Sequence, residues 1–367
     1  MRLRRLLIVT VSLLLLGVIA SLQAKPTPPD KKDEPAPACT PTEIKNELND
    51  DDPKDEKLNN PAKKYTIKFH KDKTYVIDLE SKDFDAYLRL LDKKGKQLAE
   101  DDDGGGELNS RIIHSAIETG DHQIVATSLD GQAGKFTLKI RELNLKGEAK
   151  ARKLGKDGLD INDEIGPNDT SDLDKLSKIL TVQLKAGQSY MFDLDTTDFD
   201  PQLFVFDGKS KLLGQDMMKV IQAATANGAH HLVVKSFDGQ LGKFELKIRE
   251  FTLKGEAKAR AIGKDGLSIT EQIGNNDTSP IGKLGKIYSV QLKAGQSYTI
   301  DLGSQDLDSY LYLFDSKSSL LAQDDDSGDG LNSRITFRPE RDGVFHILAT
   351  TLGGQDTGEF TLKVRKD

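Results

Sequence analysis

Three copies of one segment run through the chain, and repetition on this scale constrains the fold more than any other feature. The copies read TYVIDLESKDFDAYLRLLD, SYMFDLDTTDFDPQLFVFD and SYTIDLGSQDLDSYLYLFD. Their Asp-Phe-Asp or Asp-Leu-Asp motif begins at Asp83, Asp198 and Asp306, in steps of 115 and 108 residues. Such a step is the size of a small domain rather than of a solenoid turn, so each copy must bury a core of its own.

Within each copy, apolar residues recur at every second position. The closing segments read KFTLKIR, KFELKIR and EFTLKVR. Strict alternation is typical of antiparallel strands with one buried face and one solvated face. A second strand, at 87–91, 203–206 and 310–314, is apolar on both faces, which predicts a place in the middle of a sandwich, covered on both sides. Helix signals are almost absent.

These patterns predict an all-β protein of three tandem β-sandwich (jelly-roll-like) domains with seven or eight strands each. The connectors repeat as well, because LKGEAKARKLGKDG before the second copy matches LKGEAKARAIGKDG before the third. The predicted division is signal peptide 1–24, disordered Pro-rich and charged linker 25–42, sandwich 43–142, connector 143–157, sandwich 158–250, connector 251–265 and sandwich 266–367.

The N-terminus has the layout of a secretory signal peptide. Three arginines precede an apolar run at 6–20, and small residues offer cleavage after Ala20 or after Ala24. The run is shorter than the roughly 20 residues that a membrane-spanning helix needs. We therefore expect a secreted, periplasmic or cell-surface protein without a spanning segment once the signal is removed. An uncleaved membrane anchor is the alternative.

The following stretch, 25–42, holds half of the 12 prolines of the chain, with charges between them, and cannot bury a core. It is expected to be a semi-extended linker. Cys39 is the only cysteine, so no disulfide forms within one chain. It is either an incidental thiol on this linker or the site of an intermolecular disulfide.

Charge and motifs exclude two classes of function. The net charge of −7, with lysines mixed among acids, gives no basic footprint for nucleic acid. No His-Glu-x-x-His, Gly-x-Ser-x-Gly or Cys-x-x-Cys motif occurs, so we predict no enzyme activity. His122 and His230 fall where the third copy has Phe345, which favours packing positions over ligand roles.

An acidic loop is the sharpest candidate site. Asp101, Asp102 and Asp103 precede three glycines, and Asp324, Asp325 and Asp326 precede SGDG. At about 4 Å and an effective dielectric constant of about 20, two such carboxylates repel by about 4 kcal/mol, which bound Ca²⁺ would relieve. The hypothetical Ca²⁺ ligands are these six residues together with Asp85 and Asp308 of the preceding motif. The alternative is a solvated turn in which Asp and Gly serve the backbone.

The second copy is an internal control for this loop. It has Met217-Met218-Lys219-Val220 where the others carry their acidic loops, and it is shorter by seven or eight residues between its two shared motifs. The second domain should therefore lack any such site, and if it still folds, the loop is not needed for the scaffold.

The segments LKAGQSYTIDL, DLDSYLYLFD, LLAQDDDSGDGLNSRITF and DGVFHILATTLGGQDTGEFTLKV resemble the bacterial pre-peptidase C-terminal domain. The resemblance extends over three copies, in the tandem form of planctomycete secreted proteins. It implies β-sandwich modules that are accessory to secretion, solubility or binding of insoluble substrates. No peptidase is attached here, so the host activity does not carry over.

Together these features predict a secreted, non-catalytic binding or structural protein whose partner is an extracellular polymer, either glycan or protein. One alternative is a Ca²⁺-dependent carbohydrate- or protein-binding surface module. Another is an accessory module of a secreted peptidase system. The remaining rivals are a purely structural spacer and an enzyme with an unrecognised site. The sequence specifies neither the ligand nor the oligomeric state.

Overall fold

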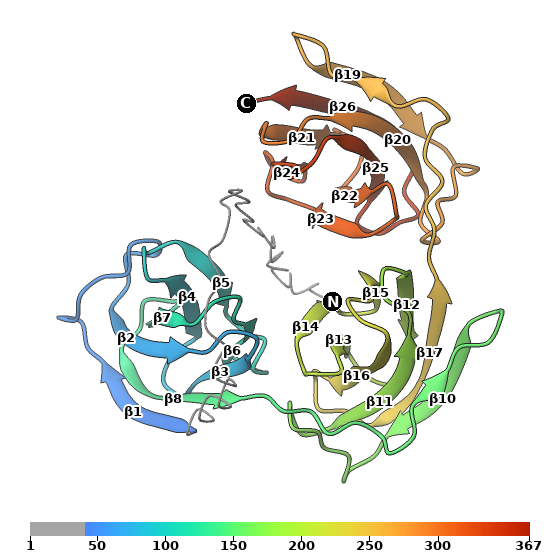
Figure 1. Cartoon of the computed structure of the whole chain (residues 1–367). Helices are drawn as coiled ribbons and strands as arrows, with labels where there is room; N and C mark the ends of the chain where they lie inside the picture. Colours follow the sequence, from blue (N-terminus) through green and yellow to red (C-terminus); the bar gives the residue numbers. More distant parts are fainter. Residues whose placement is uncertain (1–40) are drawn as a thin grey trace, which may run out of the picture.

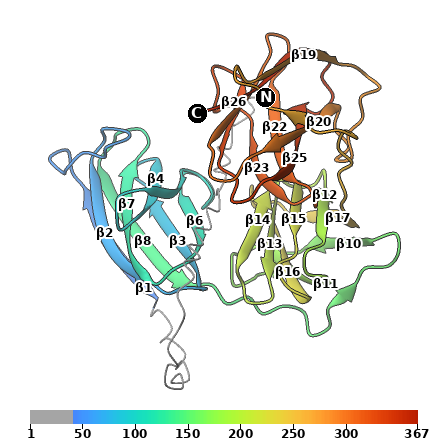
Figure 2. The same cartoon turned by 45° about the horizontal axis from the view of Figure 1, so that its top comes forward.

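The computed structural model describes residues 41–367, and three domains follow one another along an arc (Figures 1 and 2). These residues form strands joined by turns and loops, without a helix, so the predicted all-β class is confirmed. None of them forms a helix that could span a membrane. The predicted signal peptide, nearly all of the predicted linker and Cys39 lie outside the described residues.

Domain 1 comprises β1 to β8, and its strand order is that of a jelly roll. One sheet has the order β1-β8-β3-β6 and the other has β2-β7-β4-β5, with every neighbouring pair antiparallel. The strands are β1 (Thr42–Leu48), β2 (Ala62–Phe69), β3 (Thr74–Ser81), β4 (Ala86–Asp92), β5 (Gln97–Asp101), β6 (Ser110–Ser115), β7 (Gly120–Ser128) and β8 (Gly134–Glu142).

Domains 2 and 3 repeat this order. In domain 2 the sheets are β10-β17-β12-β15 and β14-β13-β16-β11, and in domain 3 they are β19-β26-β21-β24 and β23-β22-β25-β20. The strands are β10 (Leu159–Ile165), β11 (Ser177–Leu184), β12 (Ser189–Asp195), β13 (Pro201–Asp207), β14 (Leu212–Asp216), β15 (Lys219–Ala223), β16 (Gly228–Ser236), β17 (Gly242–Glu250), β19 (Leu267–Ile273), β20 (Gly285–Leu292), β21 (Tyr298–Gly303), β22 (Ser309–Asp315), β23 (Leu320–Asp324), β24 (Ser333–Phe337), β25 (Gly343–Thr351) and β26 (Gly358–Lys366).

Each predicted connector adds a two-residue strand to the domain that follows it. β9 (Arg152–Lys153) pairs in parallel with β11, and β18 (Arg260–Ala261) pairs in parallel with β20. The connectors are therefore part of the folded domains rather than free spacers.

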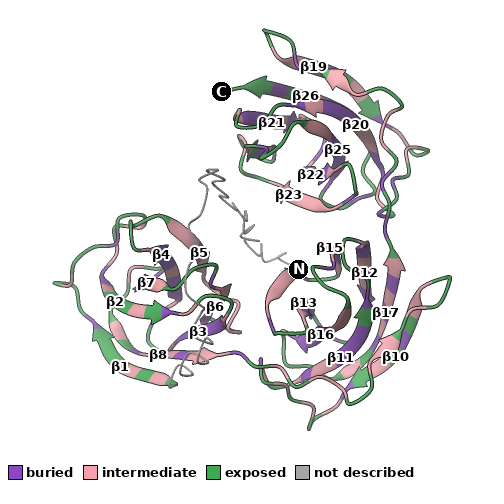
Figure 3. Ribbon diagram, in the orientation of Figure 1, coloured by how far each residue is buried: buried purple, intermediate pink, exposed green. Residues whose placement is uncertain are grey.

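Each sandwich has its own apolar core between its two sheets, visible as the buried strands in Figure 3. Tyr75, Tyr190 and Tyr298 occupy matching positions and are at most 2% exposed. The hydroxyl of each accepts a hydrogen bond from the backbone N–H five residues earlier, at 3.0 to 3.1 Å. This bond satisfies the buried phenol and ties the preceding turn to the core.

The strands that are apolar on both faces owe their second buried face to a neighbouring domain. Phe204 and Phe206 on β13 pack in one cluster with Val76 on β3 of domain 1. Tyr312 and Phe314 on β22 likewise join a cluster with Ile221 on β15 of domain 2. The predicted burial on both faces is correct, and its cause is docking between domains.

Domain 1 covers the matching face of β4 by itself, with charged groups. Arg89 takes the position of Phe204 and Tyr312, and its Nη1 lies 2.5 Å from Oδ1 of Asp55 in the loop before β2. Tyr87 donates to Glu100 at 2.6 Å. Among the described residues, this face of domain 1 is thus covered without a neighbouring domain.

Domain 2 keeps the shared strand order without the acidic loop. Its β14 and β15 are joined by Met217 and Met218 alone, whereas residues 102–109 and 325–332 separate the corresponding strands of domains 1 and 3. The sequence prediction that the scaffold does not require the loop is confirmed.

The histidines near Phe69 generate a prediction about acid stability. The His114 ring lies 5.6 Å from His122 and 6.2 Å from Phe69, and burial, aided by His122, lowers the pKa of His114 to about 4. Its pKa is about 6.5 when unfolded, so domain 1 loses stability as pH falls from about 6.5 towards 4, by about 2 kcal/mol at pH 5. Domain 3 has Phe337 and Phe345 in these places, in edge contact at 5.5 Å.

We therefore expect His114→Phe to remove most of this loss. Hydrogen exchange of β3 and β6 peptides at pH 5 and pH 7.5 measures it, and His70→Gln, outside this pair, is the control. An equal loss in His114→Phe and wild type would contradict the assignment.

Candidate functional site: the acidic loops and the contact between domains 1 and 2

The first aspartate of each acidic loop organises the loop backbone. Oδ2 of Asp101 accepts hydrogen bonds from the N–H groups of Gly104 at 2.8 Å and Arg111 at 2.7 Å. Oδ2 of Asp324 accepts the same two bonds, from Ser327 at 3.1 Å and Arg334 at 2.7 Å. Burial raises the pKa of Asp101 to about 7 against the effect of these bonds, with Asp103 and Asp102 adding to the rise.

A glycine and an asparagine close each loop. The N–H of Gly105 donates to the carbonyl of Asn109 at 2.8 Å, and Gly328 donates to Asn332 in the same way. A Cβ at Gly105 would lie 2.7 Å from that carbonyl oxygen, so the approach requires glycine. Oδ1 of Asn109 accepts the N–H of Ser81 at 3.0 Å, which fixes the loop to the end of β3.

The structure places Asp85 and Asp308 beside the far arms of the loops, apart from the three consecutive aspartates of the predicted calcium set. Leu108 accepts a hydrogen bond from the N–H of Ala86 at 3.0 Å, so the far arm of the loop lies beside Asp85. Leu331 and Ser309 repeat this contact beside Asp308. A groove of about 420 Å³ there is lined by Asp85 among other residues, and Asp101, Asp102 and Asp103 do not line it.

Elsewhere in the predicted set, burial raises the pKa of Asp325, with Asp326 and Asp324 adding to the effect. Within residues 41–367, no group of three or more His, Cys, Asp or Glu side chains is arranged to hold a metal ion. Calcium binding therefore stays a prediction. The first aspartate of each loop, Asp101 or Asp324, already accepts hydrogen bonds from backbone N–H groups.

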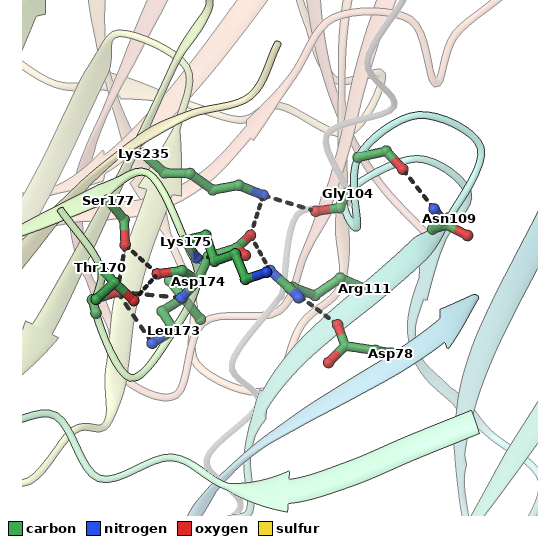
Figure 4. Close-up of polar contacts among 12 residues, drawn as sticks. Asp78, Gly104, Asn109, Arg111, Thr170, Leu173, Asp174, Lys175, Ser177 and Lys235 are labelled. Atoms are coloured by element: carbon green, nitrogen blue, oxygen red, sulfur yellow. Dashed lines mark hydrogen bonds and ion pairs between the residues drawn. The ribbon is translucent and has the colours of Figure 1, made fainter. Parts of the chain in front are cut away.

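The acidic loop of domain 1 also touches domain 2, through an ion-pair network (Figure 4). Arg111 pairs with Asp78 of its own domain and with Asp174 of domain 2. Nζ of Lys235 lies 2.9 Å from Oδ2 of Asp174 and donates to the carbonyl of Gly104 in the loop at 3.4 Å. The loop backbone is thus a docking surface for a lysine of the next domain.

The network is largely withdrawn from water. The side chains of Lys235 and Arg111 are 5% and 12% exposed, and that of Asp174 is 22% exposed. Although burial favours the neutral acid, Lys235 and Arg111 hold the pKa of Asp174 below its usual value. Such a charge depends on its partner, because a buried ion left alone is costly.

A second arginine of domain 1 holds the turn that carries Asp174. Nη1 and Nη2 of Arg141 donate to the carbonyls of Asp172 and Leu173, at 2.7 and 2.8 Å. The two arginines therefore bind one acidic turn, residues 171–174, by a carboxylate and by two backbone oxygens.

Each connector is attached to the domain that follows it by a pair of reciprocal hydrogen bonds. Glu148 accepts the N–H of Thr181 at 2.7 Å, and its own N–H donates to the Thr181 hydroxyl at 2.8 Å. Glu256 and Ser289 form the same reciprocal pair before domain 3. This is the structural role of the repeated LKGEAKAR motif.

The contact between domains 2 and 3 uses the same faces with different charges. Lys219 replaces Arg111 and lies 3.0 Å from Asp193 and 2.9 Å from the carbonyl of Ile281. Gly282 stands where domain 2 has Asp174. Nζ of Lys283 lies 4.8 Å from the centroid of the Tyr310 ring, a cation–π contact.

Sequence reasoning missed the docking residues Arg111, Asp174 and Lys235. Arg111 carried a signal, because the segment LNSRI occurs in the first and third copies alone. Asp174 and Lys235 had none, since each belongs to a single copy and the pairing joins two domains.

Substitution of Asp174 tests the network. We expect Asp174→Asn to destabilise the contact by about 3 kcal/mol, because it leaves the Lys235 ammonium buried without a carboxylate. In domain 3, Gly282 and Thr350 occupy the positions of Asp174 and Lys235. The double variant Asp174→Gly with Lys235→Thr recreates that pair, so it should destabilise the contact by less than the sum of its two single changes. Hydrogen exchange of β13 and β16 peptides measures both, and strict additivity would count against the pairing.

Calcium binding is tested by thermal unfolding. If the loops bind Ca²⁺, calcium at ten times its Kd should stabilise each site by roughly 1.4 kcal/mol and raise Tm by about 5 °C. The double variant Asp102→Asn with Asp325→Asn should lose the rise, and Asp200→Asn, in the domain without the loop, should keep it. Absence of any rise in wild type at millimolar calcium would remove the hypothesis.

Comparison with known proteins finds one segment that matches a family model. The model of the bacterial pre-peptidase C-terminal domain matches residues 285–351, which run from β20 to β25 of domain 3. No curated protein matches the chain. The tandem, planctomycete-type arrangement is therefore still a sequence resemblance.

Three solved structures show remote similarity. The pre-peptidase C-terminal domain of a Bacillus anthracis collagenase is 12% identical, over 31% of this chain and 100% of that chain, with a TM-score of 0.25. A Sulfolobus turreted icosahedral virus structure is 10% identical over 83% and 82%, with a TM-score of 0.19. The M60 catalytic domain with CBM51 domains of Clostridium perfringens ZmpB is 9% identical over 84% and 34%, with a TM-score of 0.20. The sequence of the third domain is therefore similar to the bacterial pre-peptidase C-terminal domain over residues 285–351.

Proposed function

We propose that the chain is a secreted, non-catalytic binding or structural protein in which three sandwich modules act as one rigid array. The observation that carries this proposal is the repeated docking of domains. Domain 1 meets domain 2, and domain 2 meets domain 3, through the same pair of sheet faces and the same connector motif. Two apolar clusters and two fixed connectors hold neighbouring modules at set distances.

Rigid spacing suits a repetitive ligand. Linked modules gain avidity only when they can engage their ligand at the same time, and a fixed array removes the entropy of bringing them into line. An extracellular polymer, either glycan or protein, offers such repeated sites. The family match at residues 285–351 supports a location outside the cytoplasm, because such domains occur in secreted proteins.

A role as accessory module of a secreted peptidase system is the second candidate, and the same family match favours it. On this alternative the array supplies substrate binding to a separate catalytic protein. A Ca²⁺-dependent version of either role depends on the acidic loops and is decided by the calcium experiment above.

Uncoupling the array tests the proposal. Phe204 is 3% exposed and packs against domain 1 rather than in the core of domain 2, and domain 1 has Arg89 at this position. We expect Phe204→Arg to open the contact between domains 1 and 2 because it places a charge opposite Val76. Small-angle X-ray scattering should then report a larger radius of gyration, with Phe204→Leu as the conservative control.

The functional readout is co-sedimentation with insoluble peptidoglycan, chitin, cellulose and collagen. We expect wild type to bind one of them and Phe204→Arg to bind at least tenfold more weakly, since avidity is lost. Equal binding by an opened array would contradict the rigid-array mechanism. Absence of binding to the polymers and to a glycan array would contradict polymer binding and favour the purely structural role.

A further inference from the structure

Within residues 41–367, no other domain covers the sheet face of domain 3 that corresponds to the face by which domains 1 and 2 hold the domain after them. Register identifies it: β21 pairs with β26 and β24 as β3 pairs with β8 and β6 in domain 1. A groove of about 630 Å³ lies on this face, lined by Asp301, Arg334 and Arg365 among other residues.

The apolar centre of the docking face is missing in domain 3. Val76 and Ile113 form a cross-strand pair in domain 1, and Met191 with Ile221 takes that place in domain 2. The corresponding pair in domain 3 is Thr299 with Thr336. The Thr299 hydroxyl donates to Oδ1 of Asp367 at 2.6 Å, so the centre of this face is polar in domain 3.

The charged part of the face is retained. Arg334 corresponds to Arg111, and each lies opposite an aspartate of the central strand, Asp301 or Asp78. Arg365 corresponds to Arg141 by its register with the central strand. Domain 3 therefore has counterparts of both domain 1 arginines, Arg111 and Arg141, which bind the acidic turn 171–174 of domain 2.

Comparison of the two domain contacts shows that an arginine at the position of Arg111 is paired with a carboxylate of the following domain. Where Lys219 replaces it, the following domain has Gly282 in place of Asp174 and contributes only the carbonyl oxygen of Ile281 to the lysine. Where Arg111 is present, the following domain offers Asp174. Arg334 is of the first-domain type, which indicates a carboxylate partner. A guanidinium binds carboxylates with directed, charge-assisted bonds that an ammonium cannot reproduce.

We propose that the free face of domain 3 binds an acidic turn of another protein, in which a carboxylate meets Arg334 and backbone carbonyls meet Arg365. This inference rests on the proposed binding role and names the partner chemistry of one of its surfaces.

The arginines are accessible and held in place. The Arg334 side chain is 38% exposed, against 12% for Arg111 beneath its partner. Arg365 is 51% exposed, and its Nη1 lies 2.9 Å from Oδ2 of Asp301. Three further acids line the groove, Asp306, Asp329 and Glu359, so a partner's carboxylate must reach the two arginines directly.

A second copy of this chain does not fit the face as well. The loop of domain 1 that corresponds to the acidic turn carries Asp55, which is 2% exposed. Oδ1 of Asp55 binds Arg89, and its Oδ2 accepts the N–H groups of Lys57 and Leu58 at 2.8 and 2.9 Å. That carboxylate serves its own domain and is not available to Arg334 of a second copy.

The test uses the full chain and a cyclised peptide of the sequence Thr-Ser-Asp-Leu-Asp-Lys-Leu-Ser, which is residues 170–177. The arginine Nε–Hε resonances are followed in an NMR titration at low salt. We expect the signals of Arg334 and Arg365 to shift with a Kd of about 1 mM, and the affinity to fall with added salt.

Two variants and one altered peptide provide the comparison. Arg334→Lys, which copies domain 2, and Arg365→Gln should each weaken binding at least fivefold. The peptide with Asn for its second aspartate should lose binding, while Arg249→Gln in domain 2 leaves it unchanged. Absence of shifts at about 10 mM peptide, or equal affinity in wild type and Arg334→Lys, overturns the inference. Neither result affects polymer binding by the array, so the proposed function is judged separately.

Discussion

The need to cover a second apolar sheet face governs the whole molecule. In each domain the strand β4, β13 or β22 buries one face in its own core, and its other face must also leave water. Domains 2 and 3 satisfy this with the preceding domain, through Phe204 and Phe206 or through Tyr312 and Phe314. Domain 1 has no preceding domain among the described residues and substitutes Arg89, bound to Asp55. One position on this strand, Arg89, Phe204 or Tyr312, therefore distinguishes a face that is covered within its own domain from a face that is covered by the preceding domain.

Electrostatics then distinguishes two contacts that share the same geometry. An apolar cluster brings the sheets together without specifying which domain follows which. Between domains 1 and 2, Asp174 pairs with Arg111 and Lys235. Between domains 2 and 3, Lys219 donates a hydrogen bond to a backbone carbonyl of the turn that contains Gly282. Exchange of the two docking turns would leave a buried ammonium or guanidinium without its acceptor, so charge enforces the order of the domains.

Much of the fold could be predicted because it depends on local pattern. Alternation in KFTLKIR and its copies follows from one wet and one dry sheet face, and the loopless second copy correctly indicated that the acidic loop is dispensable. The site was harder to predict because it is shared between domains. The acidic loop attracted attention by its carboxylates, yet Asp101 serves backbone N–H groups and Gly104 contributes a carbonyl to Lys235. Pairings between distant segments have no period that a single sequence can reveal.

The two-residue strands of the connectors have a consequence for solubility. β9 and β18 lie along β11 and β20, so those sheet edges do not offer a full row of free backbone groups. The corresponding strand of domain 1, β2, has no described strand on its outer side. It carries Lys63, Lys64 and Lys68 instead, and lysines along an edge discourage pairing with a strand of another chain. The first domain thus protects by charge the edge that the other two protect by an added strand.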